Sequence, residues 1–362
     1  MSDYDAMYKT IGALAGGVAA LVGGIHPEPD GGAWGPAPPA SILRVMTTRS
    51  RCRVAALLAV VLAAGACRDA GPRQASPVPQ SSTTAASHPT PTTLPPTTGA
   101  PARAGADQPI AGFVAFGDFG GGPGQLPVAQ AMLKWTASHR VDALVTTGDN
   151  VYDFGEPALF PAQLEVPYRS LRAQGRPLWA TLGNHDESAG HGDEELAFLR
   201  LPALPYAQQL QGVRLLFLDA NRPDAAQAAW LNQQLDQPGP QFSVVVFHQP
   251  AFSCGLHGST PEVDVNWVPV FEARRVALVL NGHDHDYFHF LSAAGVTYVV
   301  TGGGGRGLYP VRAGCAPPEL KASAVRYHFT AVEVYAGRLV VSAVGDDGTV
   351  FDKFEIPAPR AP

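Results

Sequence analysis

Five short segments of the chain carry side chains that can bind a metal ion, and each segment follows a run of apolar residues. The side chains in question are Asp118, Asp149, Tyr152, Asn184, His185, His248, His283 and His285. Together they offer carboxylates, imidazoles, an amide and a phenol, which are enough donors for two ions. Mixed nitrogen and oxygen ligation suits zinc, iron or manganese, and no cysteine lies close enough in sequence to indicate a thiolate site.

Each of these residues also has a structural interpretation when taken singly. An aspartate after a strand is usually a helix cap, and a lone histidine is usually a surface or core residue. Five such segments in one chain are not explained in that way. Four further histidines and three aspartates lack such support, and we expect them to be structural, solvated or supporting groups: His139, His191, His289, His328, Asp186, Asp284 and Asp286.

The apolar runs predict an α/β domain in which the polar groups follow the carboxyl ends of strands. Strands are predicted at 113–116, 143–146, 178–181, 213–218, 244–247, 276–280 and 298–300, and helices at 127–138 and 225–235. Beyond residue 324 the pattern becomes alternating, with antiparallel strands predicted at 327–335, 338–344 and 350–356. A glycine before most of the candidate ligands leaves room for a tight turn from strand to loop.

The order of the motifs Gly-Asp-x-Gly, Gly-Asp-x-x-Tyr, Gly-Asn-His-Asp, Val-x-x-His and Gly-His-x-His resembles that of the calcineurin-like metallophosphoesterases. The resemblance extends over roughly residues 111–354 and is closest to the purple acid phosphatase branch. Gly120 stands where other members of the family carry histidine, and Tyr152 stands where the purple branch has its iron-binding tyrosine. The absence of an appended domain before the catalytic one makes the small tartrate-resistant acid phosphatases the most similar group.

The resemblance implies a four-layer α/β/β/α sandwich of two mixed β-sheets and a site for two metal ions. One ion, Fe(III), would be held by Asp118, Asp149, Tyr152 and His285. The second, a divalent Fe, Zn or Mn, would be held by Asn184, His248 and His283 and would share Asp149 as a bridge. Hard anionic phenolate and carboxylate donors suit a trivalent ion, whereas an amide and two imidazoles suit a divalent one.

The function that follows from the resemblance is a binuclear-metal acid phosphatase that hydrolyses phosphate monoesters by attack of a metal hydroxide. His185 and His257 would face the substrate and assist the leaving group. The alternative interpretation of His257 is a histidine of a surface loop. Two alternatives remain: a phosphodiesterase of the same fold, or a surface lipoprotein that binds a metal or a ligand without turnover.

Two other features near these motifs have open interpretations. The four glycines at 302–305 could let the backbone approach the substrate or metal-bound oxygens, or could form a turn that needs positive φ. Cys254 and Cys315 are two leftover cysteines in a protein that the leader segment marks as exported, and they could be bonded to each other.

The first third of the chain contains segments for export and tethering. Residues 46–67 form a basic and then apolar signal peptide that ends in small residues before Cys67, as in a bacterial lipobox. Cys67 is either lipidated or incidental to ordinary cleavage. Residues 1–45 are interpreted as a misassigned upstream start, and residues 68–109 as a disordered Pro/Ser/Thr linker before a catalytic domain at 110–358. We therefore expect an exported bacterial protein, either a cell-surface lipoprotein or a secreted one.

Composition limits the possible partners. The net charge is −6, which argues against nucleic acid or an anionic membrane surface as the main partner because both would select a basic face. No apolar run reaches the length of about 18 residues that spans a bilayer. We expect small phosphate-ester substrates, contact with a membrane only through a lipid on Cys67, and a monomer.

Overall fold

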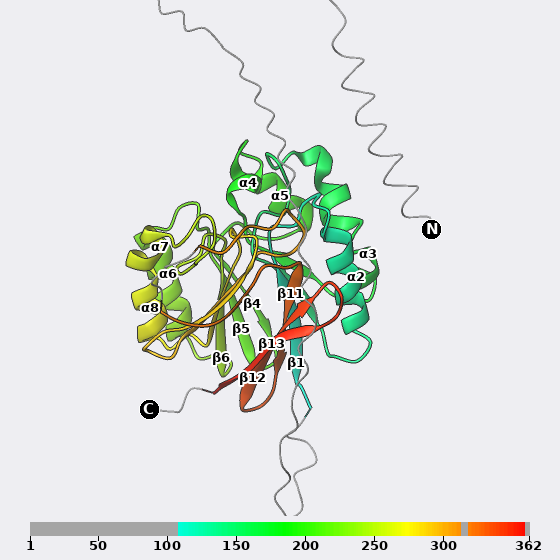
Figure 1. The fold of residues 1–362 in the computed structure, drawn as a ribbon. Helices are drawn as coiled ribbons and strands as arrows, with labels where there is room; N and C mark the ends of the chain where they lie inside the picture. The colour runs from blue at the N-terminus through cyan, green and yellow to red at the C-terminus, as the bar shows by residue number, and fades with distance from the viewer. Residues whose placement is uncertain (1–107, 313–317, 359–362) are drawn as a thin grey trace, which may run out of the picture. The chain divides into compact units, whose positions relative to one another are not determined.

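The computed structural model describes residues 108–312 and 318–358, which form two β-sheets flanked by helices (Figure 1). The described residues belong to the second of two units into which the chain divides, Thr93–Pro362. The predicted upstream segment, the signal peptide with Cys67 and nearly all of the linker lie outside the described residues. Within the described part, no helix has the length and apolar character needed to cross a bilayer.

The first sheet contains six strands in the order β13-β12-β11-β1-β2-β3. Its strands are β1 (Ala111–Phe116), β2 (Ala143–Thr146), β3 (Leu178–Ala180), β11 (His328–Val334), β12 (Arg338–Gly345) and β13 (Val350–Pro357). The first three are parallel to one another, and the C-terminal three form an antiparallel meander that joins them through the pairing of β11 with β1. The sheet is therefore mixed.

The second sheet contains seven strands in the order β10-β8-β9-β7-β6-β5-β4. Its strands are β4 (Tyr206–Leu210), β5 (Val213–Phe217), β6 (Phe242–Val246), β7 (Leu278–Asn281), β8 (Tyr287–Leu291), β9 (Thr297–Thr301) and β10 (Glu319–Ala324). The central strands β5, β6, β7 and β9 are parallel, whereas β4, β8 and β10 are paired antiparallel to their neighbours. This sheet is also mixed.

Helices flank the two sheets on opposite sides, with α2 and α3 on one side and α6, α7 and α8 on the other (Figure 1). The helical segments are α2 (Gln125–Trp135), η1 (Pro157–Leu159), η2 (Pro161–Glu165), α3 (Arg169–Arg172), α4 (Asn184–Glu187), α5 (Gly192–Leu199), α6 (Ala225–Asp236), α7 (Pro261–Asn266) and α8 (Val268–Ala273). The side chain of Asp224 caps α6 by accepting a hydrogen bond of 2.9 Å from the backbone N–H of Gln227.

Three apolar clusters fill the spaces between these layers. Strand β1 shows the division: Phe113 and Ala115 pack between the two sheets, whereas Val114 and Phe116 pack toward the cluster that contains Met132 of α2. A third cluster packs the outer face of the second sheet against α6, α7 and α8. Successive side chains of a strand point to opposite faces, so a continuous apolar run is expected for a strand covered on both faces.

The predicted four-layer sandwich of two mixed sheets is confirmed, and every strand predicted from an apolar run is present within a few residues. The antiparallel C-terminal segment is confirmed as well. Three strands were not predicted, namely β4, β8 and β10. The predicted helix at 127–138 begins two residues earlier and ends three residues earlier, at Trp135.

Candidate metal centre

The candidate ligands lie in loops that leave the carboxyl ends of parallel strands in both sheets. From the first sheet, β1 leads to Asp118, β2 to Asp149 and Tyr152, and β3 to Asn184. From the second sheet, β6 leads to His248, and β7 leads to His283 and His285. The topology therefore delivers side chains from separate parts of the sequence to one edge of the sandwich.

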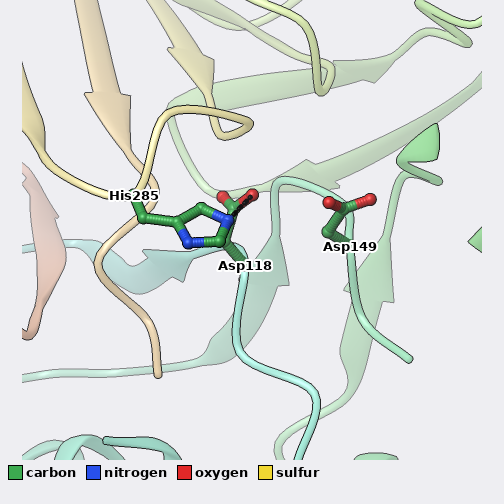
Figure 2. A group of neighbouring side chains, drawn as sticks. All are labelled: Asp118, Asp149 and His285. Carbon is green, nitrogen blue, oxygen red and sulfur yellow. Dashed lines mark ion pairs between the residues drawn. The ribbon is translucent and has the colours of Figure 1, made fainter. Parts of the chain in front are cut away.

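Asp118, Asp149 and His285 form the centre of this group (Figure 2). Each offers one potential ligand atom, and these atoms all lie within 4.8 Å of one another. The three side chains are buried, and His285 Nε2 is 3.5 Å from Oδ1 of Asp118. Burying two carboxylates side by side is costly unless a cation is present.

Tyr152 lies directly against this group. Its phenol O–H donates a hydrogen bond of 2.7 Å to Oδ2 of Asp149. The phenol oxygen also lies 3.2 Å from Nε2 of His285. The ring is 4% exposed, so the phenol faces the carboxylates rather than solvent. A sequence spacing of three residues between Asp149 and Tyr152 is enough to bring both donors to one point.

His248 and His283 also lie close to the carboxylates of this group. His248 Nε2 is 3.3 Å from Oδ1 of Asp149 and 3.3 Å from Nδ1 of His283. The Nδ1–H of His248 donates to the carbonyl oxygen of Thr147 at 2.8 Å, which leaves Nε2 directed at the carboxylates. His285 is oriented in the same way, because its Nδ1–H donates to the carbonyl of Gly307 at 2.6 Å.

Asn184 and His185 begin the short helix α4 next to the cluster. The backbone N–H of His185 donates to Oδ1 of Asp149 at 2.9 Å, and the His185 ring lies 4.2 Å from the Tyr152 ring. His185 Nδ1–H donates to the carbonyl of Asp153, and its Nε2 lies 4.0 Å from Oδ2 of Asp149. Asn184 is exposed at the first position of the helix, and its side chain makes no hydrogen bond with the described residues.

His257 is exposed at the rim of the site. The centroid of its ring lies 4.3 Å from that of the candidate ligand His283. Asp284, which lies between two candidate ligands in sequence, holds this loop. Its buried carboxylate accepts hydrogen bonds from the backbone N–H groups of His257 and Gly258, at 2.7 and 3.2 Å.

Backbone strain is concentrated at the site. Five non-glycine residues in the described part of the chain have positive φ, and three of them are the candidate ligands Asp118, Asp149 and His283. Each such residue costs about 1 kcal/mol or more, and strained backbone of this kind clusters at functional sites. The tight turns out of β1, β2 and β7 thus bring the ligands inward at the expense of local stability.

Glycines next to the ligands are required by close contacts. A Cβ atom at Gly183 would lie 2.1 Å from Oδ1 of Asp149, and one at Gly282 would lie 2.5 Å from Oδ2 of Asp118. At Gly120 a Cβ atom would lie 2.4 Å from both the carbonyl oxygen of Asn150 and Oε1 of Gln163. No histidine can therefore occupy position 120 in this arrangement.

The glycines at 302–305 pack against the loop that carries Asp118. A Cβ atom at Gly302 would lie 2.8 Å from Oδ2 of Asp118, and one at Gly304 would lie 2.3 Å from the carbonyl oxygen of Gly117. None of the four has positive φ, so the interpretation as a positive-φ turn is wrong. The glycines approach a candidate ligand closely, whereas the expected approach to a substrate or to metal-bound oxygens stays a prediction.

The electrostatics of the cluster fit a cation. Burial alone would lower the pKa of His248, but the carboxylates of Asp149 and Asp118 raise it to about 10. Burial raises the pKa of Asp118 well above its usual value, and the negative charge of the nearby Asp149 also raises it. A buried imidazole that holds its proton between two carboxylates marks a position that favours positive charge.

The other two imidazoles are neutral at neutral pH. Burial and the nearby His248 lower the pKa of His283 to about 2, and burial lowers that of His285 to about 4. A neutral imidazole has a lone pair for a metal. The donor set, its burial and its charge therefore fit a metal centre built from these residues.

Comparison with known proteins gives the family. Residues 112–287 match the family described as calcineurin-like phosphoesterase. This domain is a calcineurin-like metallophosphoesterase. Metallophosphoesterases are metal-dependent hydrolases, and the buried Asp118–Asp149–His285 cluster is the metal site of this one.

Relatives of this metallophosphoesterase include purple acid phosphatases. Purple acid phosphatase 4 of Arabidopsis thaliana is 25% identical over 236 residues, which cover 54% of this chain and 70% of the relative. Tartrate-resistant acid phosphatase type 5 of Mus musculus is 25% identical over 242 residues, covering 55% and 74%. The homology is distant.

Two further similarities were found, one in structure and one over a part of the sequence. The structure of a purple acid phosphatase from Lupinus luteus superposes with a TM-score of 0.62 at 16% identity, covering 70% of this chain and 55% of that one, and it supports the fold alone. A cAMP/cGMP dual specificity phosphodiesterase of Mycobacterium tuberculosis is 33% identical over 132 residues, which cover 31% of this chain and 37% of the relative.

The metallophosphoesterase site has two neighbours that the sequence did not indicate. The Tyr309 ring stacks on His285 with centroids 4.0 Å apart, and the Arg306 guanidinium lies 4.3 Å from the centroid of the Tyr152 ring. Arg306 also forms an ion pair with Asp153. Both residues follow the glycines at 302–305, whose contact with the Asp118 loop brings them here, and no sequence spacing encodes that contact.

Cys254 forms a disulfide, and its partner lies outside the described residues. Cys315, the predicted partner, falls within the undescribed segment 313–317. The predicted pairing therefore stays a prediction. The backbone N–H of Arg312, the last described residue before that segment, donates to the carbonyl of Cys254 at 2.8 Å.

Proposed function

We propose that this metallophosphoesterase is an acid phosphatase of the purple type that hydrolyses phosphate monoesters. The observation that carries the proposal is the position of the Tyr152 phenol, which contacts both Asp149 and His285 of the metal site. Gly120 supports it, because no side chain fits at the position where other branches would place a ligand.

The donor set supports two ions of different character. Asp118, Asp149, Tyr152 and His285 would hold Fe(III), since they combine hard anionic oxygens with one imidazole. His248, His283 and Asn184 would hold a divalent Fe, Zn or Mn, with Asp149 shared. When bound, the two ions would lower the pKa of a water nucleophile and neutralise charge on the phosphate.

The remaining groups of the site would handle the leaving group. His185 is fixed by its backbone hydrogen bond to Asp149 and by the bond from its Nδ1 to Asp153. Its Nε2, 4.0 Å from Oδ2 of Asp149, makes no hydrogen bond there and can present a proton to the ester oxygen. His257 lies against His283 at the exposed rim, where a departing alkoxide would meet it. Asp284 positions His257 through two backbone hydrogen bonds of its loop.

A phosphodiesterase is the second candidate. The observation that favours it is the local similarity of 33% to a cyclic-nucleotide phosphodiesterase. Side-by-side turnover of p-nitrophenyl phosphate and bis(p-nitrophenyl) phosphate by the purified protein separates the two. A kcat/KM that favours the monoester supports the phosphatase, and one that favours the diester supports the alternative.

We further propose that the protein is exported and is tethered through Cys67 or secreted, and that it acts as a monomer on small phosphate esters. The supporting features are the basic and apolar segment 46–67, the Pro/Ser/Thr linker at 68–109 and the acidic net charge of −6. Sedimentation of the purified protein tests whether it is a monomer, and a dimer would contradict this part of the proposal.

A further inference from the structure

A hollow of about 640 Å³ lies on the first sheet's side of the domain, away from the metal centre. It is lined chiefly by α3, by the loop from α3 to β3 and by the end of α5. Pro177 of its lining precedes β3, whereas the candidate ligand Asn184 follows β3. The strand thus runs from this hollow toward the metal centre, and the two sites share no residue.

Four of the side chains lining the hollow are arginines. Its charged and aromatic lining residues are Arg169, Arg172, Arg176, Arg200, Glu165 and Phe198. Within residues 108–312 and 318–358, none of the four arginines forms an ion pair. The guanidinium group is always charged, so four positive charges face one hollow with a single carboxylate among them.

Such a concentration of charge is unusual in a chain whose net charge is −6. Arg176 is held in place, because its Nε donates to the carbonyl of Val141 at 2.7 Å and its Nη1 to Gln174 at 2.8 Å. Arg200 has φ 61 at the C-terminal end of α5, a conformation that glycine adopts at lower cost. A favourable interaction with a helix dipole is open to Arg200 at the end of α5 and to Arg169 and Arg172 in the last turn of α3. Because α3 has only four residues and Arg176 lies outside any helix, the dipoles do not explain why all four arginines face one hollow.

We propose that this hollow is a second anion-binding site for a soluble ligand that carries several phosphate or sulfate groups. Guanidinium groups bind such oxyanions in a two-pronged geometry, and bound anions would relieve the repulsion among the arginines. The volume is in the range of small-molecule sites, and the exposed Phe198 ring offers an apolar contact for the body of the ligand.

The test uses inositol hexasulfate, a polyanion that contains no phosphate ester, and isothermal titration calorimetry of the full chain. The variant R172A/R200G removes two of the four charges, and glycine suits the backbone at position 200. The variant loses two charge-assisted contacts, so binding should weaken by about tenfold or more. Hydrolysis of p-nitrophenyl phosphate should be unchanged, because neither residue belongs to the metal centre.

Two controls make the result specific. K134A/K353A removes the same charge from exposed lysines elsewhere and should retain wild-type affinity. Asp149→Asn, which alters the metal centre, should also retain it. Unchanged affinity in R172A/R200G would overturn the proposal. The proposal would also be overturned if R172A/R200G and K134A/K353A lost affinity for inositol hexasulfate to the same extent. Loss of binding in Asp149→Asn alone would overturn it too.

Discussion

The phenol oxygen of Tyr152 lies 2.7 Å from Oδ2 of Asp149, to which it donates a hydrogen bond. Burial raises the pKa of this phenol well above its usual value, and the nearby carboxylates of Asp118 and Asp149 raise it further. Only a strongly positive ion at this position would favour the phenolate. The contact therefore links the identity of the first metal to a single side chain.

Tyr152→Phe removes that phenol and keeps the ring. If Tyr152 binds Fe(III), the wild-type protein absorbs visible light through phenolate-to-iron charge transfer, and the variant loses this band. Its fold should persist, because the ring still packs against His185. Visible and circular dichroism spectra of both proteins check this. Tyr309→Phe is the matched control, and the same loss of colour in that variant would contradict the assignment.

His185→Ala should keep both metals and lose activity. The side chain contributes no metal ligand in the proposed arrangement, and loss of a general acid lowers kcat by roughly 10²- to 10⁴-fold. His248→Ala and Asn184→Ala should instead lose the divalent ion, since each removes a donor. Metal analysis alongside kcat measures the difference, with His191→Ala as a neutral neighbour. Metal loss in His185→Ala would show that it has a different role.

The loss of activity in His257→Ala should depend on the leaving group of the substrate. An activated aryl phosphate departs with little need of a proton, whereas an alkyl phosphate needs one. The variant should therefore be much slower than wild type on alkyl phosphates and nearly normal on p-nitrophenyl phosphate. Ratios of kcat/KM for the two substrate types check this. If both substrates show the same small deficit, His257 is not the acid.

The buried carboxyl group of Glu195 should make the stability of the protein depend on pH. Burial raises the pKa of this carboxyl well above its usual value, and the charge of Asp186 raises it further. Because the pKa of Glu195 is higher in the folded than in the unfolded protein, binding of its proton stabilises the fold at low pH. This contribution to stability is lost as the pH rises from the unfolded-state pKa of about 4.3 through the folded-state pKa. Glu195 Oε1 accepts a hydrogen bond of 2.9 Å from Asn150.

Glu195→Gln keeps an acceptor for Asn150 and removes the charge. The wild-type Tm should fall as the pH rises above about 4.3, and the variant should show a weaker decline. Thermal unfolding of metal-free protein between about pH 4 and pH 8 measures both curves. Parallel curves would mean that Glu195 does not control this dependence.

The sequence allowed the fold class and the clustered residues Asp118, Asp149 and His285 to be predicted, because each of them follows a buried strand closely and has a glycine close by. The other ligand assignments stay predictions. Other features depend on contacts that no local pattern encodes. Strand β10 is largely exposed and lacks an apolar run, and β8 follows the His283–His285 motif without a break. Tyr309 reaches His285 only because the glycines at 302–305 pack against the Asp118 loop.

The leader segment predicts where the mature protein begins. Mass spectrometry of protein isolated from its native host should find no residue before Cys67, and an acyl mass on Cys67 if it is lipidated. A soluble product that starts a few residues later would reject the anchor. Peptides from residues 1–45 would reject the interpretation of that segment as a misassigned start.

Elemental analysis of the purified protein tests the central claim most directly. The account predicts two metal ions per chain, one of them iron and the other iron, zinc or manganese, because Asp149 lies between two sets of donors. Zinc at both positions would contradict the Fe(III) assignment, and one ion or none per chain would contradict the binuclear centre itself.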